Sequence, residues 1–356
     1  MLRMKSWEVI VIGGGIIGLS LAIELRKNGA SLLVVERGEP GREASHAAGG
    51  MLVDYAEETH PALQPLATAS ALMYPEFVRQ LQVDSRINAD LRDQGTILFS
   101  SAGHENNSGL SSGPLTAVQL AELEPALTTI DHPAFYLRER SVDPRGLTAA
   151  ALGAAKHIGV DVSSGEEVTA VALADGRVCG VVTKKTTFHC DKVVNCAGAW
   201  SGQIAPHAFP TRPVKGQMLC LISPAHGLLK HVIRAPEVYL IPRSDGRILA
   251  GATVEEAGFD KRTDVATIKR LYSAAIALVP QLRNAKILED WAGLRPGTPD
   301  GLPILGATGS PGYFVATGHF RDGILLAAIT ARVMAQVIAG KQPDYDLEAF
   351  SAARFG

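Results

Sequence analysis

Three glycines and one acidic residue near the start of the chain have the spacing of a dinucleotide site. Gly13, Gly15 and Gly18 follow an apolar run. Glu36 ends a second apolar run, eighteen residues after the last of these glycines. In such a motif the glycines allow a tight turn, a close backbone approach to a pyrophosphate and close packing of a helix on a strand. The acid accepts the hydroxyls of an adenosine ribose. The alternative is a glycine-rich strand–helix corner without a ligand.

The composition of the segment after Glu36 distinguishes an FAD site from an NAD site. Gly38–Met51 is rich in glycine, alanine and serine, whereas a simple dehydrogenase continues here with another helix and strand of the same sheet. Small residues let the backbone approach something flat or charged. This composition favours FAD over NAD.

A second glycine-bracketed turn lies near the other end of the chain. Thr317–Ile324 (TGHFRDGI) has the pattern of a short strand, a turn and a helix start. A helix that begins here would point its positive end at an anion, and Arg321 adds a full charge. One candidate anion is the N1/O2 edge of a flavin, which becomes negative on reduction, and preoriented donors stabilise developing charge. The alternative is an ordinary capped helix near the C-terminus.

The elements that must position these residues alternate between α/β segments and β-rich insertions, which predicts two interleaved domains. The predicted helices are Ala62–Val83 with a kink or break at Pro75, Thr116–Leu123, Gly146–His157, Asp264–Val279 and Ile324–Gly340. The predicted strands are Thr96–Phe99, Val160–Leu173, Arg177–Thr183, Phe188–Asn195, Thr211–Ile222, Val238–Pro242, Arg247–Thr253, Lys286–Arg295 and Tyr313–Thr317. Residues 104–113 are predicted to form a polar loop.

Composition predicts a globular protein with more than one core. The chain has 356 residues, 46% of them hydrophobic and 20% charged, with a net charge of −2. These values give no electrostatic footprint for nucleic acid. Val9–Ile23 is apolar but too short to span a bilayer, so we expect a cytoplasmic protein without an integral membrane segment. The four cysteines have no C-x-x-C spacing and the histidines do not cluster, so we expect reduced thiols and no metal.

Five motifs together carry a family resemblance. Besides the opening glycine motif they are Ala47–Met51 (AAGGM), Asn195–Ser201 (NCAGAWS), Trp291–Gly297 (WAGLRPG) followed by DGLP, and GHFRDGI. In this order, over essentially the whole chain, they resemble the D-amino-acid-oxidase-like FAD flavoproteins, and are most similar to the glycine oxidase branch associated with thiamine biosynthesis.

The resemblance implies an α/β fold, with a Rossmann-like FAD-binding domain of discontinuous segments and a substrate domain with an antiparallel sheet and flanking helices. The FAD-binding domain would comprise 1–85, 141–212 and 286–356, and the substrate-binding domain 86–140 and 213–285. FAD would be bound non-covalently, since no cysteine stands where covalent relatives carry one, in about Arg283–Gly323. A homo-oligomer is expected by family analogy.

The same resemblance assigns cofactor contacts along the chain. Ile16 and Ile17 would lie at the pyrophosphate turn, and Glu36 and Arg37 at the ribose. Val168 would contact the adenine side through its backbone. The residues expected to line the flavin and diphosphate are Ala44, Ser45, Gly49, Gly50 and Met51, and those expected to close over the isoalloxazine edge are His319, Phe320, Arg321, Asp322, Gly323, Ile324 and Leu325.

For the substrate, the resemblance implies Arg295 as a carboxylate clamp with Arg321 near the same pocket, and Tyr239 as a hydroxyl donor to the carboxylate. A planar guanidinium can hold a carboxylate with two parallel hydrogen bonds. The alternatives are a structural arginine bonded to backbone carbonyls and a tyrosine packed in a sheet core.

Two positions depart from the glycine oxidase pattern. Glu237 stands where a histidine is common, and Val254 follows the GAT stretch where a methionine occurs. An acid at position 237 would either pair with the substrate amine or face solvent. A changed wall of the substrate pocket at these positions would admit a larger or N-substituted amino acid.

The implied reaction is the oxidation of a small amino acid, either glycine or an N-substituted or D-amino acid. The substrate Cα would transfer hydride to flavin N5, the imine would hydrolyse to a 2-oxo acid, and O2 would be reduced to H2O2. No residue is a convincing base, so none is assigned. The alternatives are an amino-acid dehydrogenase that passes electrons to a quinone, a non-catalytic flavin-binding subunit of a larger dehydrogenase, and a tRNA-modifying oxidase, against which the absence of basic tracts argues.

Overall fold

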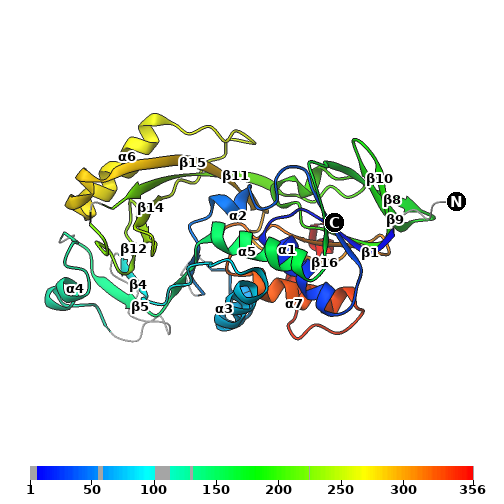
Figure 1. The fold of residues 1–356 in the computed structure, drawn as a ribbon, viewed down its shortest axis with the longest axis horizontal. Helices are drawn as coiled ribbons and strands as arrows, with labels where there is room; N and C mark the ends of the chain where they lie inside the picture. Colours follow the sequence, from blue (N-terminus) through cyan, green and yellow to red (C-terminus); the bar gives the residue numbers. More distant parts are fainter. Residues whose placement is uncertain (1–5, 55–58, 101–112, 129–130, 224, 356) are drawn as a thin grey trace.

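The computed structural model describes residues 6–54, 59–100, 113–128, 131–223 and 225–355. Two large sheets lie end to end, with helices packed below the centre and above the left end in the view of Figure 1. The predicted polar loop at 104–113 lies outside the described residues except for its last position.

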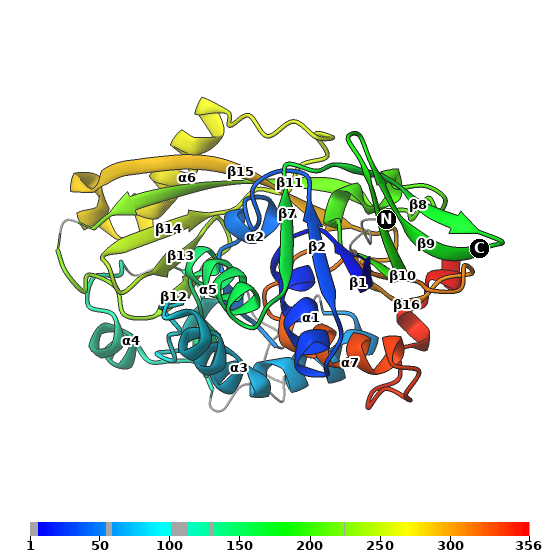
Figure 2. The same cartoon turned by 45° about the vertical axis from the view of Figure 1, so that its right-hand side comes forward.

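The first sheet, which has eight strands in the described part of the chain, carries the dinucleotide motif. Its order is β16-β17-β10-β1-β2-β7, and β9 pairs with both β10 and β8. The strands are β1 (Ser6–Ile12), β2 (Leu32–Glu36), β7 (Asp161–Ser164), β8 (Val168–Ala174), β9 (Arg177–Thr183), β10 (Thr187–Asn195), β16 (Ile304–Ala307) and β17 (Tyr313–Thr317). The chain between β1 and β2 forms α1 (Ile16–Lys27), which is drawn beside β2 in Figure 2.

The parallel pairing of this sheet brings distant motifs together. β17, β10, β1, β2 and β7 run parallel, so their carboxyl ends meet at one edge. Ligands of open α/β sheets bind outside that edge. Gly13 follows β1, Cys196 follows β10 and Gly318 follows β17. The order of the sheet therefore explains why the glycine motif, NCAGAWS and GHFRDGI face a common space.

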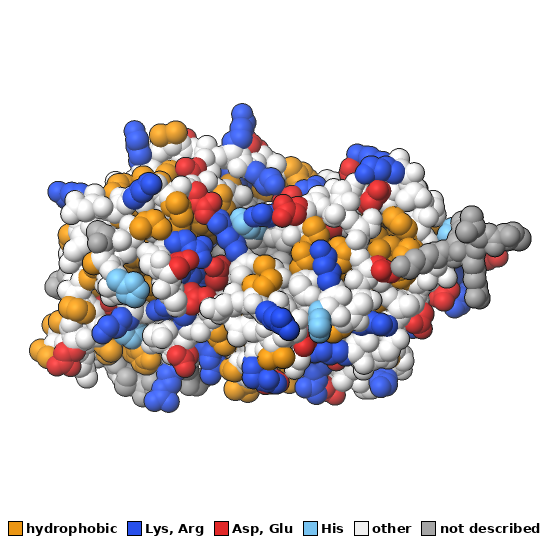
Figure 3. Space-filling view, viewed as in Figure 1, with side chains coloured by type: hydrophobic (Ala, Val, Ile, Leu, Met, Phe, Trp, Pro, Cys, Tyr) orange, Lys and Arg blue, Asp and Glu red, His pale blue; other side chains and the backbone are white. Residues whose placement is uncertain are grey.

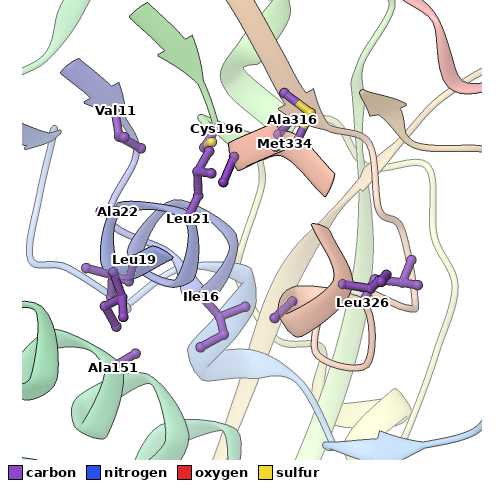
Figure 4. Packing of buried hydrophobic residues seen from close by; sticks show 14 of the residues in the cluster. Val11, Ile16, Leu19, Leu21, Ala22, Ala151, Cys196, Ala316, Leu326 and Met334 are labelled. Atoms are coloured by element: carbon purple, nitrogen blue, oxygen red, sulfur yellow. The ribbon is translucent and has the colours of Figure 1, made fainter. Parts of the chain in front are cut away.

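The two faces of the sheet bury alternate residues, as the twofold period of strands requires. Val9, Val11 and Val34 face a core formed with α1, α3 (Gln64–Ser85), α5 (Pro144–His157) and α7 (Ala327–Ile338). Ile10 and Val35 face the other way, toward β8 and β9. In Figure 4, Leu19 of α1 points toward Ala151 of α5, while Leu21 points toward Cys196. Because most of α1 is buried, its sequence is apolar except for Ser20 until its last turn, which carries Glu24, Arg26 and Lys27.

The second sheet has seven strands in the described residues, in the order β15-β11-β14-β13-β12-β4-β5. Its strands are β4 (Thr96–Phe99), β5 (Ala134–Leu137), β11 (Arg212–Ile222), β12 (Val232–Arg234), β13 (Tyr239–Pro242), β14 (Arg247–Gly251) and β15 (Lys286–Gly297). One face packs on α6 (Val265–Leu278), through Leu271 and Ala275. The opposite face presents Met218, Ile241 and Tyr239.

Short elements join the two sheets. α2 (Ala44–Ala47) packs against β15, and this approach requires Gly293, since a Cβ there would lie 2.3 Å from the Cβ of Ala47. β3 (Met51–Leu52) pairs with β6 (Arg140–Ser141). A separate short helix, α4 (Ala117–Leu123), begins at a capping box made by Thr116 and Gln119. The segment after Glu36 thus crosses from the first sheet to the second.

The predicted α/β fold is confirmed, and most predicted elements occur. The second sheet is antiparallel as predicted except between β12 and β4, which pair in parallel. Four details differ from the predictions in whole or in part. The predicted single strand Val160–Leu173 is two strands, because the chain turns at Gly165 (φ +72°) between β7 and β8. Of the kink or break predicted at Pro75, the break does not occur, since Pro75 lies inside α3. The last helix begins at Ala327, later than predicted. The short strands β5, β12 and β16 were missed, because three or four residues carry too little periodicity.

One strand belongs to a different sheet from the one that the predicted domain division implies. β15 pairs with β11 in the second sheet, whereas the prediction put residues 286–356 with the FAD-binding segments. The domain division as a whole stays a prediction. Among helices of the described residues, none combines the length and hydropathy that a bilayer-spanning segment needs. The face in Figure 3 shows acidic and basic side chains interspersed, without a field of one sign.

Three of the four thiols are expected to be unreactive in the folded protein. Cys190, Cys196 and Cys220 are buried, and burial raises the pKa of Cys190 to about 12 and that of Cys220 to about 11. Since the thiolate is the reactive form, a chromogenic thiol reagent at pH 8 should modify only the partly exposed Cys179 in the native state, and all four cysteines after unfolding. Fast reaction of more than one thiol in the native protein would contradict the described packing.

Candidate active site

A cavity of about 990 Å³ extends from the carboxyl edge of the first sheet to the second sheet. Its lining draws on strand ends, loops and helix starts that are far apart in the sequence. Among the predicted residues it includes Gly13, Gly15, Ile16, Ile17, Glu36, Arg37, Ala44, Ser45, Gly49, Gly50, Met51, Val168, Tyr239, Arg295, His319, Phe320, Arg321, Asp322, Gly323 and Ile324. This volume is at the upper end of about 300–1,000 Å³, the range usual for ligand sites.

Two glycines of the opening motif are required by close backbone contacts. At Gly13 (φ +104°) a Cβ would lie 2.5 Å from the carbonyl oxygen of Cys196. At Gly18 it would lie 2.0 Å from the carbonyl oxygen of Gly13. Gly18 does not line the cavity. Its role is the one its position in the motif predicts, close packing of helix on strand, and its effect on a ligand is therefore indirect.

Glu36 organises the dinucleotide end of the cavity. Its carboxylate accepts hydrogen bonds from the backbone N–H groups of Gly14 (2.8 Å) and Gly38 (2.9 Å). Each carboxylate oxygen can accept a further bond, so both oxygens remain able to receive a ribose hydroxyl. The Ile16 N–H at the start of α1 donates to Ser45 Oγ (3.0 Å), which fixes the small-residue segment against the helix N-terminus.

Arg37 and Trp200 form a stacked wall at the same end. The guanidinium carbon of Arg37 lies 3.5 Å from the Trp200 ring centroid, and Arg37 also pairs with Glu43 (2.6 Å). Both Arg37 and Trp200 line the cavity. Arg37 thus lies at the cavity, and its predicted place at the ribose stays a prediction, whereas Trp200 was not among the predicted site residues although its motif, NCAGAWS, had been noticed.

Two side chains from strands of the second sheet, or from the residue after a strand, hold the AAGGM segment in place by hydrogen bonds. Trp291 Nε1 donates to the carbonyl of Ala47 (3.1 Å), and the Arg243 guanidinium donates to the carbonyl of Gly49 (2.5 Å). Gly50 has φ +78°, and a Cβ there would lie 2.1 Å from the carbonyl of Val142. These contacts hold a backbone without bulky side chains at the cavity wall, where a flat ring system can approach.

The GHFRDGI turn forms the wall on the first-sheet side. It lines the cavity as an irregular turn, because α7 begins only at Ala327, so the predicted helix start at this turn is wrong. Burial lowers the pKa of His319 to about 3, which keeps it neutral. Burial raises the pKa of Asp322 to about 6, although the positive charge of Arg321 lowers it. Leu325 is buried in the core and does not line the cavity, contrary to its predicted place.

Arg295 and Tyr239 meet where the cavity reaches the second sheet. The Arg295 guanidinium donates to the carbonyls of Thr253 (3.0 Å) and Lys215 (3.3 Å) through Nη1. Burial raises the pKa of Tyr239, and the adjacent Arg295 guanidinium lowers it. The backbone bonds resemble those of a structural arginine, yet the side chain also borders the cavity.

Two glycines make room for this pair. A Cβ at Gly216 would lie 2.3 Å from Arg295 Nη1, and one at Gly251 would lie 2.9 Å from the ring of Tyr239. Arg321 borders the cavity and is close enough to influence the pKa of both Arg295 and Tyr239. The three residues predicted to handle a substrate are therefore brought together.

The structure places the two residues that depart from the glycine oxidase pattern, Glu237 and Val254, in different surroundings. Val254 lines the cavity. Glu237 is exposed and is not part of the lining, so of its two alternatives the structure favours the one in which it faces solvent. Other lining residues escaped sequence analysis, among them Leu98, Glu139, Met218 and Arg234. Leu98, Glu139 and Arg234 lie on short strands or just after them, and Met218 lies within the longer β11, in each case without a motif that would have marked the residue.

Taken together, a Rossmann-type sheet and a cavity that continues to a second sheet define a dinucleotide-binding protein whose ligand extends beyond the first domain. The glycine cradle at one end and the small-residue wall in the middle fit FAD, whose pyrophosphate and flavin need these environments. The sequence of residues 8–337 matches the family described as FAD dependent oxidoreductase. The chain belongs to this family, and FAD is its cofactor.

Several characterised relatives are similar over nearly the whole chain. The bifunctional protein ThiO/ThiG of Trichormus variabilis is 35% identical over 98% of this chain and 55% of its own length. Glycine oxidase of Pseudomonas putida is 33% identical over 96% of this chain and 97% of its own. The crystal structure of glycine oxidase from Geobacillus kaustophilus superposes with a TM-score of 0.92, at 31% identity, covering 98% and 99% of the two chains. The chain thus spans about half the length of the bifunctional relatives.

Proposed function

We propose that this protein oxidises a small amino acid with FAD and O2, giving a 2-oxo acid, an amine or ammonia, and H2O2. The observation that carries the proposal is the placement of Arg295 beside Tyr239 at the far end of the cavity that begins at the glycine motif. A guanidinium and a phenol hydroxyl are suitable donors for one carboxylate. The similarity to proteins named glycine oxidase supports the same class of substrate.

The residues of this chain bind and orient the substrate. Arg295 would hold the carboxylate and Tyr239 would donate to it, while Arg321 adds positive charge at the same end. FAD, when bound, supplies the two-electron oxidation of the substrate C–N bond. The chain supplies position and electrostatics, which can account for a large part of catalysis. The buried side chains of Met218 and Leu294 and the half-buried Ala252 add an apolar wall to the cavity.

A second function is favoured by one comparison. The hydrogen cyanide synthase subunit HcnC of Pseudomonas aeruginosa is 30% identical over 99% of this chain and 97% of its own. The name of this relative supports an alternative in which the chain works as one subunit of a larger enzyme. We propose as the second function a dehydrogenase that passes electrons to an acceptor other than O2, such as a quinone.

Oxygen consumption separates the two functions. Purified protein with bound FAD should consume O2 and produce H2O2 with at least one of glycine, sarcosine, proline and D-alanine. Reduction of an artificial dye by the same amino acids without peroxide would favour the dehydrogenase. Failure of all substrates with both acceptors would contradict both functions.

Tyr239→Phe is expected to raise KM by about 5- to 15-fold with little change in FAD content, because it removes one hydrogen bond worth about 1–1.5 kcal/mol. Steady-state kinetics and the flavin absorbance of the purified variant measure the two quantities. Tyr136→Phe provides a control, since that hydroxyl donates to the carbonyl of Gln94 outside the cavity lining. An unchanged KM in the first variant would refute the role of the hydroxyl.

A further inference from the structure

Three side chains from the end of β13 pack against Gly49 of the AAGGM segment. A Cβ at Gly49 would lie 2.7 Å from Ile241 Cδ1 and 3.5 Å from the ring of Tyr239. Arg243, which directly follows the last residue of β13, donates from Nη2 to the carbonyl oxygen of Gly49 (2.5 Å). Side chains at every second position share one face of a strand. A tyrosine, an aliphatic side chain and a cation therefore approach this glycine from the same side.

The chain around Gly49 connects the two ends of the cavity. Ser45, shortly before it, accepts a hydrogen bond from the Ile16 N–H at the start of α1, which is the helix N-terminus where a pyrophosphate binds. Gly49 itself lies against Tyr239, at the end where the substrate would bind. Ser45, Gly49 and Gly50 all line the cavity. An FAD whose pyrophosphate is at α1 and whose ring must reach the substrate therefore extends its flavin along Gly49 and Gly50.

The peptide group between Gly49 and Gly50 is bonded at one end and open at the other. Its carbonyl oxygen accepts the hydrogen bond from Arg243. Its N–H group, which belongs to Gly50, donates to no other residue in the described part of the chain. Gly50 is nevertheless buried, and it lines the cavity. Because buried N–H groups without a partner are rare in folded proteins, this one indicates an acceptor on a bound ligand.

The cation on the other side of this peptide group is almost completely enclosed. Arg243 is 3% exposed, and its Nε and Nη1 atoms have no hydrogen-bond partner among the described residues. Burial lowers the pKa of Arg243 to about 10, while Asp143 and Asp90 raise it, so the guanidinium stays charged at neutral pH. Of the hydrogen bonds that the described residues offer this charge, the bond to the Gly49 carbonyl is the one that it makes.

We propose that Arg243 is a positioning residue that acts on the flavin through this peptide group, by polarising the Gly49 carbonyl and so strengthening the Gly50 N–H as a donor to the ring. A hydrogen bond at one end of a peptide group strengthens the bond at the other end, and a charged donor has the larger effect. Reduction adds negative charge to the ring, which a preoriented donor stabilises. Arg243 therefore raises the reduction potential of the flavin. This inference rests on the proposed function only in placing the substrate, and hence the ring, near Tyr239.

Arg243→Gln tests the proposal, because it keeps an N–H donor on the side chain but removes the charge. Equilibration of the FAD-loaded protein with a reference dye gives the ratio of reduced to oxidised flavin at a known potential. In the variant this ratio should fall about three- to tenfold, which for a two-electron couple corresponds to a midpoint potential lower by about 15–30 mV. Arg243→Lys, which keeps the charge, should restore most of the potential. An unchanged potential in Arg243→Gln would overturn the proposal.

Two control variants separate this effect from a structural one. Arg247→Gln removes a cation of the same charge cluster, which pairs with Asp143 (2.7 Å) and is not bonded to the AAGGM segment. Trp291→Phe removes the hydrogen bond to the Ala47 carbonyl, which loosens the segment without removing a charge. Neither should change the potential. A decrease in either control as large as the decrease in Arg243→Gln would overturn the proposal.

A second measurement uses the unaltered protein and stays decisive if Arg243→Gln does not fold. Consecutive glycines occur in the sequence only at positions 13–15 and 49–50. Glycine labelled with 13C at the carbonyl and with 15N therefore selects the amides of Gly14, Gly15 and Gly50 in an NMR experiment that correlates each N–H with the preceding carbonyl. Reduction of the bound flavin with dithionite should shift the Gly50 signal more than that of Gly14, which donates to Glu36. A Gly50 signal that does not respond to reduction would overturn the proposal.

Failure of this proposal is distinguishable from failure of the proposed function, because dithionite and dyes exchange electrons with the flavin whether or not an amino acid is a substrate. If amino acids reduce the flavin but Arg243→Gln leaves the potential unchanged, only the assignment of Arg243 is wrong. If the potential and the Gly50 signal change as expected but no amino acid reduces the flavin, the proposed function is wrong and the assignment of Arg243 is supported.

Discussion

Arg295→Ala is expected to raise KM for an amino acid by about a hundredfold or more while FAD stays bound. Truncating one partner of a buried, hydrogen-bonded charge pair costs about 2–5 kcal/mol, and the substrate carboxylate would lose its clamp. Arg321 lines the same cavity but belongs to the GHFRDGI turn of the first-sheet side, so it does not replace this clamp. Steady-state kinetics with the best substrate of the screen, together with the flavin spectrum of the purified variant, measure both expectations.

Two variants make this result interpretable. Arg295→Lys keeps the charge but loses the planar two-bond geometry, so it should recover only part of the loss. Arg332→Ala removes an exposed arginine of α7 that pairs with Asp344, and should leave KM unchanged. If Arg295→Ala retained a normal KM, the residue would be a structural arginine bonded to the carbonyls of Thr253 and Lys215, and the clamp assignment would be wrong.

Gly18→Ala is expected to damage the FAD site from outside the cavity. A Cβ there would lie 2.0 Å from the carbonyl oxygen of Gly13, so the turn that faces the pyrophosphate must move. Overpacking of this kind costs about 1–3 kcal/mol of stability, occasionally more. We expect a lower Tm and at least tenfold weaker FAD binding (about 1.4 kcal/mol), measured by thermal unfolding and by titration of the apoprotein with FAD.

Gly309→Ala is the matched control. At Gly309 no atom lies within 4 Å of an added Cβ, and its φ is not positive, so this variant should keep both Tm and FAD affinity. Normal FAD binding by Gly18→Ala would contradict the close packing of α1 against the turn that follows β1.

The predicted site residues that the structure brings to the cavity through local spacing follow from local rules, while their roles stay predictions. The glycine turn and Glu36 belong to one strand–helix–strand unit, in which spacing alone determines what meets at the sheet edge. Arg295 and Tyr239 came instead from family resemblance. That they lie together depends on the pairing of β13 with β14, β14 with β11, and β11 with β15.

The residues that were missed share a physical reason. Glu139 and Arg234 reach the cavity because β12 pairs in parallel with β4, and β4 pairs with β5. These strands are three or four residues long, so they carry too little alternation to reveal their inward face. Their long-range pairing, and not their own sequence, decides which side chains are inside. Glu237 looked like the acid of the site only because it is near Tyr239 in sequence. The cytoplasmic location and the homo-oligomer stay predictions.

The most direct test of the proposed function is anaerobic reduction of the bound flavin, followed by air. The purified chain should show the absorbance of oxidised FAD, lose it when glycine or another small amino acid is added without O2, and regain it with release of H2O2 when air is admitted. A flavin that no amino acid bleaches would contradict amino-acid oxidation. A flavin that is bleached but is not reoxidised by air would contradict the oxidase and support the dehydrogenase.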